Sequence, residues 1–304
     1  MIDLHVHSNY SDGSYEPAKV IENAVRDGLD AVALCDHDCI WGLAEARIRA
    51  KELGIEFIPG VELSVSINGD PDHASEIHIL GLFIHATDHL EDIHARVKKA
   101  AEAYSFDLAE AIRKNYKMPV FVEDMRHMFR STINVGAVVH YLLQKKFIKD
   151  AADWRNMVRQ LETEGKTYKN PGVGISVEEA IQAIHEAGGL TILAHPYRMG
   201  LANDVLFKRL KQYKAKGLDG VETYYTNYGT HSKSSSQEVA SQNQKALAMA
   251  KELNLLVSGG SDYHHDENKG RFQGQQGVPN KVLPSLKKAW KARTNNKDKL
   301  KVYF

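Results

Sequence analysis

One scheme recurs along this chain and limits what it can fold into. A helical pattern ends at a glycine or near one, a short apolar run follows, and a polar residue ends the run. These runs lie at residues 28–37, 54–62, 189–195, 217–222 and 253–262. Together with residues 2–7 and 77–83 they predict roughly seven buried strands. Because strands that alternate with helices build parallel sheets, we predict an α/β protein with a parallel sheet.

Helices are predicted between most of these strands, at residues 17–27, 43–53, 177–187 and 236–253. Pro17 suits the first position of a helix, and Ser176 with Glu179 forms a capping box. These start signals support the alternation of strands and helices.

Residues 89–170 depart from the scheme, because their pattern is helical almost throughout. Residues 91–116 predict one long helix, and shorter helical segments follow near 123–129, 135–146 and 151–164. We predict a helical insertion domain of residues 89–170 that caps one end of a barrel domain built from residues 1–88 and 171–304. The alternative is that these helices form one layer of a doubly wound sheet.

The amino-acid composition limits the class of protein and the cellular compartment that we expect. The chain is 43% apolar and 26% charged, which excludes disordered and fibrous classes. Its 39 basic and 39 acidic residues argue against a broad basic face for duplex nucleic acid but allow a local basic pocket. Two cysteines cannot build a disulfide framework, the start of the chain has no signal-peptide pattern, and no apolar run is long enough to span a bilayer. We expect a cytoplasmic protein with no membrane contact.

Fifteen histidines are the unusual part of the composition, and two of them open the chain in one strand. His5 and His7 are two residues apart, so both side chains leave the same face of that strand. Asp262 and His264 repeat this spacing in a late strand, and Asp12 follows the first pair in a Ser-Asp-Gly turn. Paired imidazoles at a strand end suit a transition metal such as Zn, Mn or Fe.

Three further polar residues end apolar runs. Glu62 and His195 each close one, and His37 lies in the sequence Cys-Asp-His-Asp. We take His37 to point into the barrel and Asp36 and Asp38 to cap or support it, because adjacent strand residues face opposite sides. The active sites of parallel α/β barrels lie at the carboxyl ends of the strands, where these residues fall.

These motifs together resemble the PHP (polymerase and histidinol phosphatase) superfamily of metal-dependent phosphoesterases. The matching stretches are DLHVHS at 3–8 with SDG at 11–13, CDHD at 35–38, GVEL at 60–63, IHILG at 77–81, AHP at 194–196 and GSDYH at 260–264. Cys35 stands where the family commonly has Thr or Ala. The resemblance implies a distorted (β/α)7 barrel, in agreement with the strands predicted above.

The resemblance also implies a site for three divalent ions, of Mn, Fe or Zn. His5, His7, Glu62 and Asp262 would hold the first ion; Glu62, His78 and His195 the second; Asp12, His37 and His264 the third. His78 is preferred over His73, because only His78 lies in the Ile-Leu-Gly context. His264 is likewise preferred over the adjacent His265.

Within the superfamily, the chains with an inserted helical domain are most similar, which implies nucleotide phosphatases and exonuclease-type enzymes. Arg198 matches a position that often carries a phosphate-binding arginine, and Arg130 is a candidate for a second substrate-binding arginine. This chain departs from that branch at residues 131–136, where an Arg-Pro-His stretch is common. A guanidinium can pair with the non-bridging oxygens of a phosphate.

The expected reaction is the hydrolysis of phosphomonoesters of nucleotides, such as nucleoside monophosphates or 3′,5′-bisphosphates. A hydroxide bridging two ions would attack phosphorus, with Asp262 assisting and Arg198 stabilising charge. Tyr263, Glu222 and Tyr168 are expected to line or support the site. No obligatory protein partner is expected.

Three alternatives remain. A 5′–3′ exonuclease on short RNA or DNA would need stacking aromatics and basic side chains, with Tyr104, Tyr116, Lys145 and Lys146 as candidates. A histidinol-phosphate phosphatase fits the Ser-Asp-Gly opening and the insertion less well. A non-catalytic scaffold would have lost metal ligands, and the nine are present.

Overall fold

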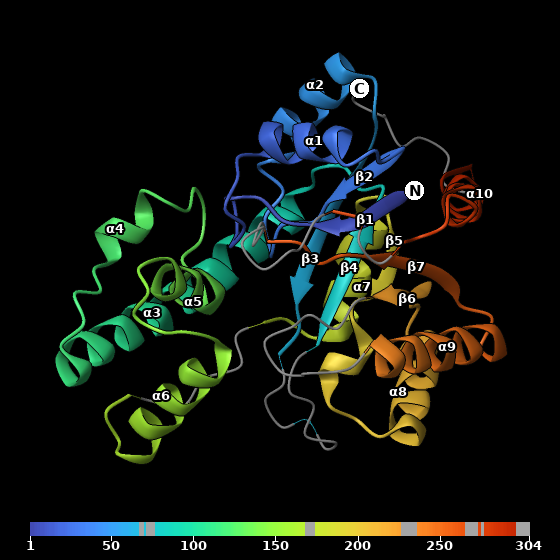
Figure 1. Ribbon diagram of the computed structural model, residues 1–304. Coiled ribbons are helices and arrows are strands. Elements are labelled where there is room, and N and C mark those ends of the chain that lie inside the picture. The colour runs from blue at the N-terminus through green and yellow to red at the C-terminus, as the bar shows by residue number, and fades with distance from the viewer. Residues whose placement is uncertain are drawn as a thin grey trace.

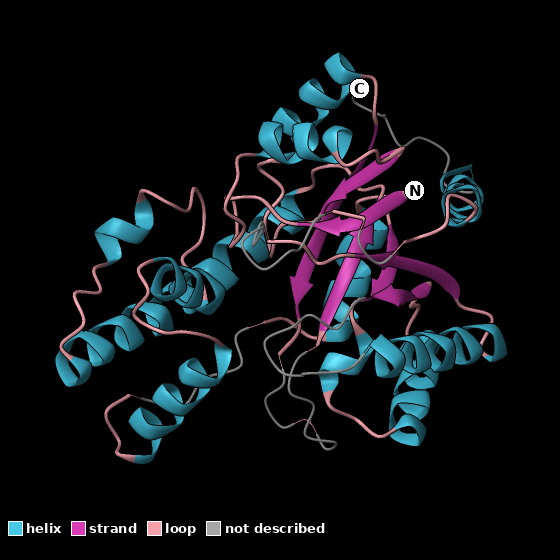
Figure 2. Ribbon diagram, in the orientation of Figure 1, coloured by secondary structure: helices cyan, strands magenta, loops and turns pink. Residues whose placement is uncertain are grey.

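The computed structural model describes residues 1–66, 70, 77–167, 174–225, 236–264, 273–274 and 277–295. One sheet of seven strands runs in the order β1-β2-β3-β4-β5-β6-β7 (Figures 1 and 2). The strands are β1 (Ile2–Val6), β2 (Ala31–Leu34), β3 (Glu56–Ser64), β4 (His78–Leu82), β5 (Leu190–Leu193), β6 (Gly220–Tyr225) and β7 (Leu256–Gly260). All seven predicted strands are confirmed.

The sheet closes on itself next to β1. The backbone N–H of His7 donates to the carbonyl of Tyr263 at 3.1 Å, and the N–H of Asp262 donates to the carbonyl of His5 at 2.9 Å. Both bonds join β1 to the segment that follows β7. The fold is therefore the distorted (β/α)7 barrel that the motifs imply.

Strand β4 corrects the prediction of a wholly parallel sheet. It pairs antiparallel with both β3 and β5, whereas the other paired strands are parallel. Antiparallel neighbours can follow each other through a short connection, and no helix is predicted in the connection from β3 to β4. The reversal places His78, which begins β4, opposite Ser64 near the end of β3.

Helices cover the outside of the barrel. They are α1 (Pro17–Arg26), α2 (Leu43–Leu53), α7 (Val177–Glu186), α8 (Asn203–Ala215), α9 (Ser236–Glu252) and α10 (Val282–Asn295), with a short 3-10 helix η1 (Pro196–Met199) after β5. The predicted helices at 17–27, 43–53, 177–187 and 236–253 are confirmed to within a residue.

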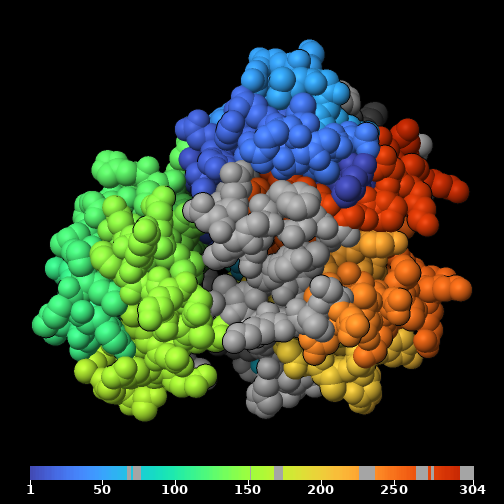
Figure 3. Space-filling view, in the orientation of Figure 1, coloured from blue at the N-terminus to red at the C-terminus, as the bar shows by residue number. Residues whose placement is uncertain are grey.

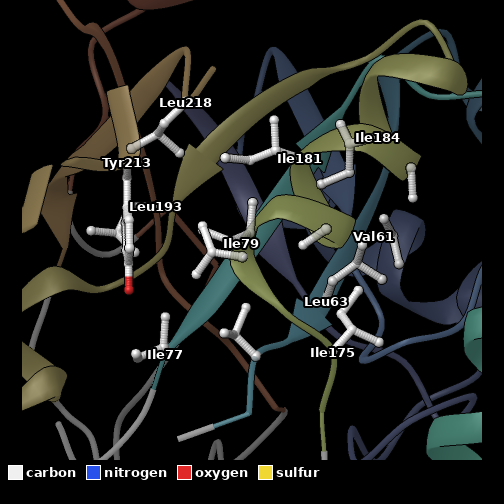
Figure 4. Close-up of a cluster of buried hydrophobic side chains, with 14 of the residues drawn as sticks. Val61, Leu63, Ile77, Ile79, Ile175, Ile181, Ile184, Leu193, Tyr213 and Leu218 are labelled. Carbon is white, nitrogen blue, oxygen red and sulfur yellow. The ribbon is translucent and has the colours of Figure 1, made fainter. Parts of the chain in front are cut away.

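Strand alternation divides the barrel core into two faces. Figure 4 shows the outer face, where Val61 and Ile79 of adjacent strands pack against Ile181 and Ile184 of α7. The alternate residues, such as Leu80, lie in a second cluster that α10 closes. Apolar side chains thus fill both faces away from the polar ends of the strands.

Residues 88–163 form four helices beside the barrel: α3 (Asp88–Tyr116), α4 (Val122–Arg126), α5 (Val135–Gln144) and α6 (Ala151–Thr163). In the space-filling view they make a lobe of their own (Figure 3). Leu90, Ile93 and Val97 at the start of α3 pack in the barrel cluster, whereas Leu108 and Ile112 further along pack with the other helices of the lobe. The helix α3 therefore joins the two parts.

Candidate metal centre

The nine predicted ligands converge at one edge of the barrel. His5 and His7 lie on and just after β1, Glu62 on β3, and His78 at the start of the reversed β4. The others lie in the loops after β1, β2, β5 and β7: Asp12, His37, His195, Asp262 and His264. His78 lies at the beginning of its strand, and the antiparallel direction of β4 brings it to the same edge.

A first group is buried in the protein. His5 Nε2 lies 3.1 Å from His7 Nε2 and 3.1 Å from Glu62 Oε2, and His7 Nε2 lies 3.2 Å from Asp262 Oδ1. Two donors bound to one ion at about 2.1 Å lie about 3.0–3.4 Å apart, depending on geometry. The spacing of this group is therefore that of ligands around one ion, and these residues could hold one.

A second group gathers around the other oxygen of Glu62. Glu62 Oε1 lies 2.9 Å from both His78 Nδ1 and His195 Nε2, and these two nitrogens are 3.2 Å apart. His37 instead approaches the oxygen that faces the first group, with its Nδ1 3.3 Å from Glu62 Oε2. Glu62 thus faces the first group with one oxygen and this group with the other, as a bridging carboxylate would.

A third group lies nearer the surface. His264 Nε2 is 3.1 Å from Asp12 Oδ1, and His37 Nε2 is 3.9 Å from Asp12 Oδ2. His7 also belongs to this set, which could hold a metal ion. The three groups share residues, so they form one continuous centre.

The contacts among these side chains fit an ion better than a closed hydrogen-bond network. Asp12 Oδ1 and His37 Nδ1 are buried, yet neither makes a hydrogen bond of acceptable geometry despite close neighbours. Imidazole and carboxylate donors together suit Zn, Mn or Fe. The side chains that are present therefore fit the metal that the motifs imply.

Charges within the centre support this fit. Burial raises the pKa of Glu62, but His5, His37 and His78 outweigh it and hold that pKa well below its usual range. Burial lowers the pKa of His37 to about 4, which leaves a neutral ring with a free lone pair. Burial also lowers the pKa of His264, but Asp12 raises it to about 10, so a metal bound there would displace a proton.

The two acids beside His37 support the loops, as predicted. Asp36 accepts hydrogen bonds from the backbone N–H and hydroxyl of Ser8 at 2.7 and 2.6 Å. Asp38 accepts from the backbone N–H and hydroxyl of Ser64 at 2.8 and 2.7 Å. Neither acid belongs to the three groups.

The two predicted substrate-binding arginines occupy different places. Arg198, on η1, donates to Asp262 Oδ2 at 2.8 Å and is largely buried. Arg130 donates to Glu45 at 3.0 Å, stacks over the ring of Tyr10 at 4.6 Å and is half exposed. Arg198 thus adjoins the centre, and Arg130 lies in the lobe opposite the barrel helix α2.

The other residues considered in the sequence have different outcomes. Glu222 is buried in the barrel and contacts His5 Nδ1 at 3.1 Å. Tyr263 packs its side chain among the apolar residues beneath α1 and α2 and does not line the site, but its backbone carbonyl accepts from the N–H of His7 at 3.1 Å and so supports it. Tyr104 is 2% exposed inside the lobe, so it offers no stacking surface. Tyr168, His73 and His265 lie outside the described residues.

Sequence reasoning missed two neighbours of the centre. Tyr225 donates its hydroxyl to Asp262 Oδ2 at 3.1 Å. A Cβ added at Gly136, in the first turn of α5, would lie 2.1 Å from Asp12 Oδ2, so the lobe touches the centre at this glycine. No local pattern identifies Gly136, because the contact joins segments more than a hundred residues apart.

Comparison with known proteins agrees with this geometry. The PHP domain family matches residues 3–283. A 5′-3′ exoribonuclease of Haemophilus influenzae is 31% identical over 264 residues, which are 86% of this chain and 89% of that protein. A 3′,5′-nucleoside bisphosphate phosphatase of Chromobacterium violaceum is 30% identical over 289 residues and covers 90% of each chain.

A solved structure from Chromobacterium violaceum, described as an amidohydrolase with bound sulfate and no metal, superposes with a TM-score of 0.74 at 27% identity. The match covers 96% of both chains. Among the described residues, no helix is both long and apolar enough to cross a membrane. The motifs, the closed barrel and the family match over nearly the whole length show that this chain belongs to the PHP family of metal-dependent phosphoesterases.

Proposed function

We propose that this enzyme hydrolyses phosphomonoesters of nucleotides, such as nucleoside monophosphates or 3′,5′-bisphosphates. The observation that carries the proposal is the convergence of nine histidine and carboxylate side chains in three groups around Glu62. Similarity to a nucleoside bisphosphate phosphatase supports a nucleotide substrate. The sulfate bound by the solved relative, a tetrahedral anion like phosphate, is in accord with this class.

The centre is proposed to hold three divalent ions of Mn, Fe or Zn. His5, His7, Glu62 and Asp262 would bind the first; Glu62, His78 and His195 the second; Asp12, His37 and His264 the third. Such ions supply an activated water at neutral pH and neutralise charge on phosphoryl oxygens. The shared carboxylate of Glu62 keeps the first two groups together.

The remaining chemistry falls to residues of the chain itself. Arg198 would donate from its guanidinium to the non-bridging oxygens of the phosphate, because its position beside Asp262 puts it next to the centre. Asp262 would orient the attacking water and accept a hydrogen bond from it, held in place by Arg198 and Tyr225. Arg130 would contact a more distant part of a longer substrate.

Residues 89–170 are proposed to act as an insertion domain that decides which leaving group is accepted. They carry an apolar cluster of their own, and α5 reaches the centre at Gly136. His140 on the same helix contacts the hydroxyl of Ser14, in the loop that carries Asp12. These contacts support a role for the lobe at the edge of the centre, and none of its described residues belongs to the three groups.

A second candidate function is the removal of 5′ nucleotides from short RNA. Similarity to a 5′-3′ exoribonuclease favours it, and the stacking of Arg130 over Tyr10 offers a cation and a ring of the kind that single strands use. Histidinol phosphate is a third substrate to test. The function does not require a protein partner.

The test is a comparison of substrates with the protein loaded with Mn. Initial rates would be measured on a nucleoside 3′,5′-bisphosphate, a nucleoside monophosphate, a short 5′-phosphorylated RNA, histidinol phosphate and a small aryl phosphate. We expect the highest kcat/KM on a nucleotide monoester. A higher value on the RNA would establish the second function, and equal low values on all five would refute both.

Elemental analysis of the desalted, metal-loaded protein tests the centre separately. We expect about three ions per chain from the three donor sets. A content of at most one ion per chain would rule out the trinuclear assignment.

A further inference from the structure

Glu222 connects two of the proposed metal ligands from inside the barrel. It lies on β6, is 1% exposed, and is not a member of any of the three groups. Its Oε1 accepts from His5 Nδ1 at 3.1 Å, and its Oε2 accepts from the backbone N–H of His195 at 2.6 Å. One carboxylate therefore contacts a residue of the first group and a residue of the second.

The contact with His5 determines which nitrogen of that ring is free. A carboxylate can only accept, so the proton of the ring lies on Nδ1, and Nε2 presents its lone pair. That nitrogen lies 3.1 Å from both His7 Nε2 and Glu62 Oε2, in the first group. Histidines that bind metals commonly donate their other ring N–H to a carboxylate in this way.

The contact with His195 holds an unusual backbone. His195 has a φ of 27°, outside the usual range for a residue with a side chain, and such conformations persist where the surroundings fix them. Glu222 binds the N–H of this residue, and the ring then reaches Glu62 Oε1 at 2.9 Å. Loss of this bond would let His195 return to ordinary strand geometry.

A second acid at the start of the same strand provides a comparison. Asp219 accepts from His185 Nε2 at 2.8 Å and from the backbone N–H of Thr191 at 2.9 Å. It thus bonds one imidazole and one backbone N–H of β5, as Glu222 bonds one imidazole and the N–H just beyond β5. Neither His185 nor Thr191 belongs to the metal groups.

We propose that Glu222 is a positioning residue for metal binding: it fixes the tautomer of His5 and the backbone of His195, and so assembles the first and second groups together. The proposal rests on the metal centre proposed above. Among the described residues, Asp219 makes the same kinds of bond, together with an ion pair to Arg293, but contacts no member of the three groups.

The decisive variant is Glu222→Gln, which preserves size but offers one acceptor where two are needed. Its amide NH₂ must face either the N–H of His195 or the ring of His5. In the second case the proton of His5 moves to Nε2 and removes the lone pair. We expect affinity for Mn or Zn, measured by competition with a chelator, to fall about 10- to 100-fold.

The matched control is Asp219→Asn, which makes the same change of carboxylate to amide beside His185. Thermal unfolding and far-UV circular dichroism would be measured for both variants. We expect Asp219→Asn to lower the melting temperature while leaving metal affinity unchanged. If Glu222→Gln does not fold, Glu222→Asp replaces it, because the shorter side chain keeps the charge but cannot reach both partners.

A third variant, His5→Ala, separates this proposal from the metal centre itself. Wild-type metal affinity in folded Glu222→Gln, together with weakened binding in His5→Ala, would overturn the positioning role and leave the centre intact. Wild-type affinity in both would overturn the centre. An equal loss of affinity in Glu222→Gln and Asp219→Asn would show a merely structural effect and also refute the proposal.

Discussion

The barrel edge and the helical lobe differ in how many polar side chains they bury. At the barrel edge, histidines and carboxylates are buried against one another, with His5, His7 and Glu62 fully enclosed. In the lobe, most buried residues are apolar, and many of them form a cluster of their own. The difference supports the proposal that the chemistry lies at the ends of the strands, where the lobe would affect it only through the contacts between the two parts.

They meet at few places close to the centre. Gly136 of α5 lies against the carboxylate of Asp12, and His140 contacts Ser14. The backbone N–H of Arg130 also donates to the carbonyl of Asn9, in the loop after β1. The following predictions test this division, beginning with the barrel.

The largest effect is expected from Glu62→Ala, which should abolish hydrolysis. Glu62 contacts His5 and His37 with one carboxylate oxygen and His78 and His195 with the other. Its removal therefore disrupts two of the proposed ligand groups at once. Phosphate release and metal content would be measured together.

The control for this prediction is His89→Ala at the start of α3, a histidine paired with Glu186 on the surface. It should keep activity and metal content near the wild-type values. Substantial hydrolysis by Glu62→Ala would contradict the assignment of a bridging carboxylate.

Arg198→Ala should lower kcat/KM by about 10- to 150-fold, because a charge-assisted hydrogen bond contributes about 1.5–3 kcal/mol. The loss should be similar on a nucleotide and on a small aryl phosphate, since Arg198 would bind the phosphate common to both. Arg198 also contacts Asp262, so the metal content of the variant must be measured. We expect the metal content to be unchanged, because the hydroxyl of Tyr225 still holds Asp262 in place. Full activity on both substrates would exclude phosphate binding by Arg198.

Gly136→Ala should lower kcat/KM by about tenfold, which corresponds to about 1.4 kcal/mol. The added Cβ would overlap Asp12 Oδ2, so either Asp12 or the start of α5 must move. Alanine favours a helix more than glycine does, so the fold of α5 should not weaken. Unchanged rates and unchanged metal content would show that the lobe does not constrain Asp12.

The smallest effect is expected from Arg130→Ala, within about fivefold in kcat/KM, since exposed ion pairs contribute about 0–1 kcal/mol. Arg130 is already paired with Glu45 and stacked on Tyr10. Any loss should be larger on a short RNA than on an aryl phosphate. An equal loss on both would place Arg130 at the reacting phosphate instead.

Much of the fold and most of the proposed centre could be predicted from the sequence. The alternation of short apolar runs with helical patterns identified the seven strands. The spacing of His5 and His7 placed that pair on one face, because side chains alternate along a strand. Asp262 and His264 have the same spacing but lie in the loop after β7, so strand alternation does not explain their position. Apolar character and the alternation of side chains depend on residues that are close in the sequence, so both can be recognised in the linear pattern.

Other features required the folded chain. The sequence did not reveal that β4 runs antiparallel, so it did not show why His78, at the beginning of a strand, lies beside residues at the ends of others. Nor did it show that Tyr263 packs outside the barrel. Strand direction depends on the connection and on neighbouring strands.

The sequence by itself determined the number of strands, the helical lobe and the residues with the chemistry of metal ligands, because those follow from periodicity and residue type. Only the tertiary structure decided how these residues group around Glu62, and that Glu222 and Gly136 adjoin them. These contacts join segments far apart in the chain, and closure of the barrel brings them within bonding distance. No local pattern encodes a distance between such segments.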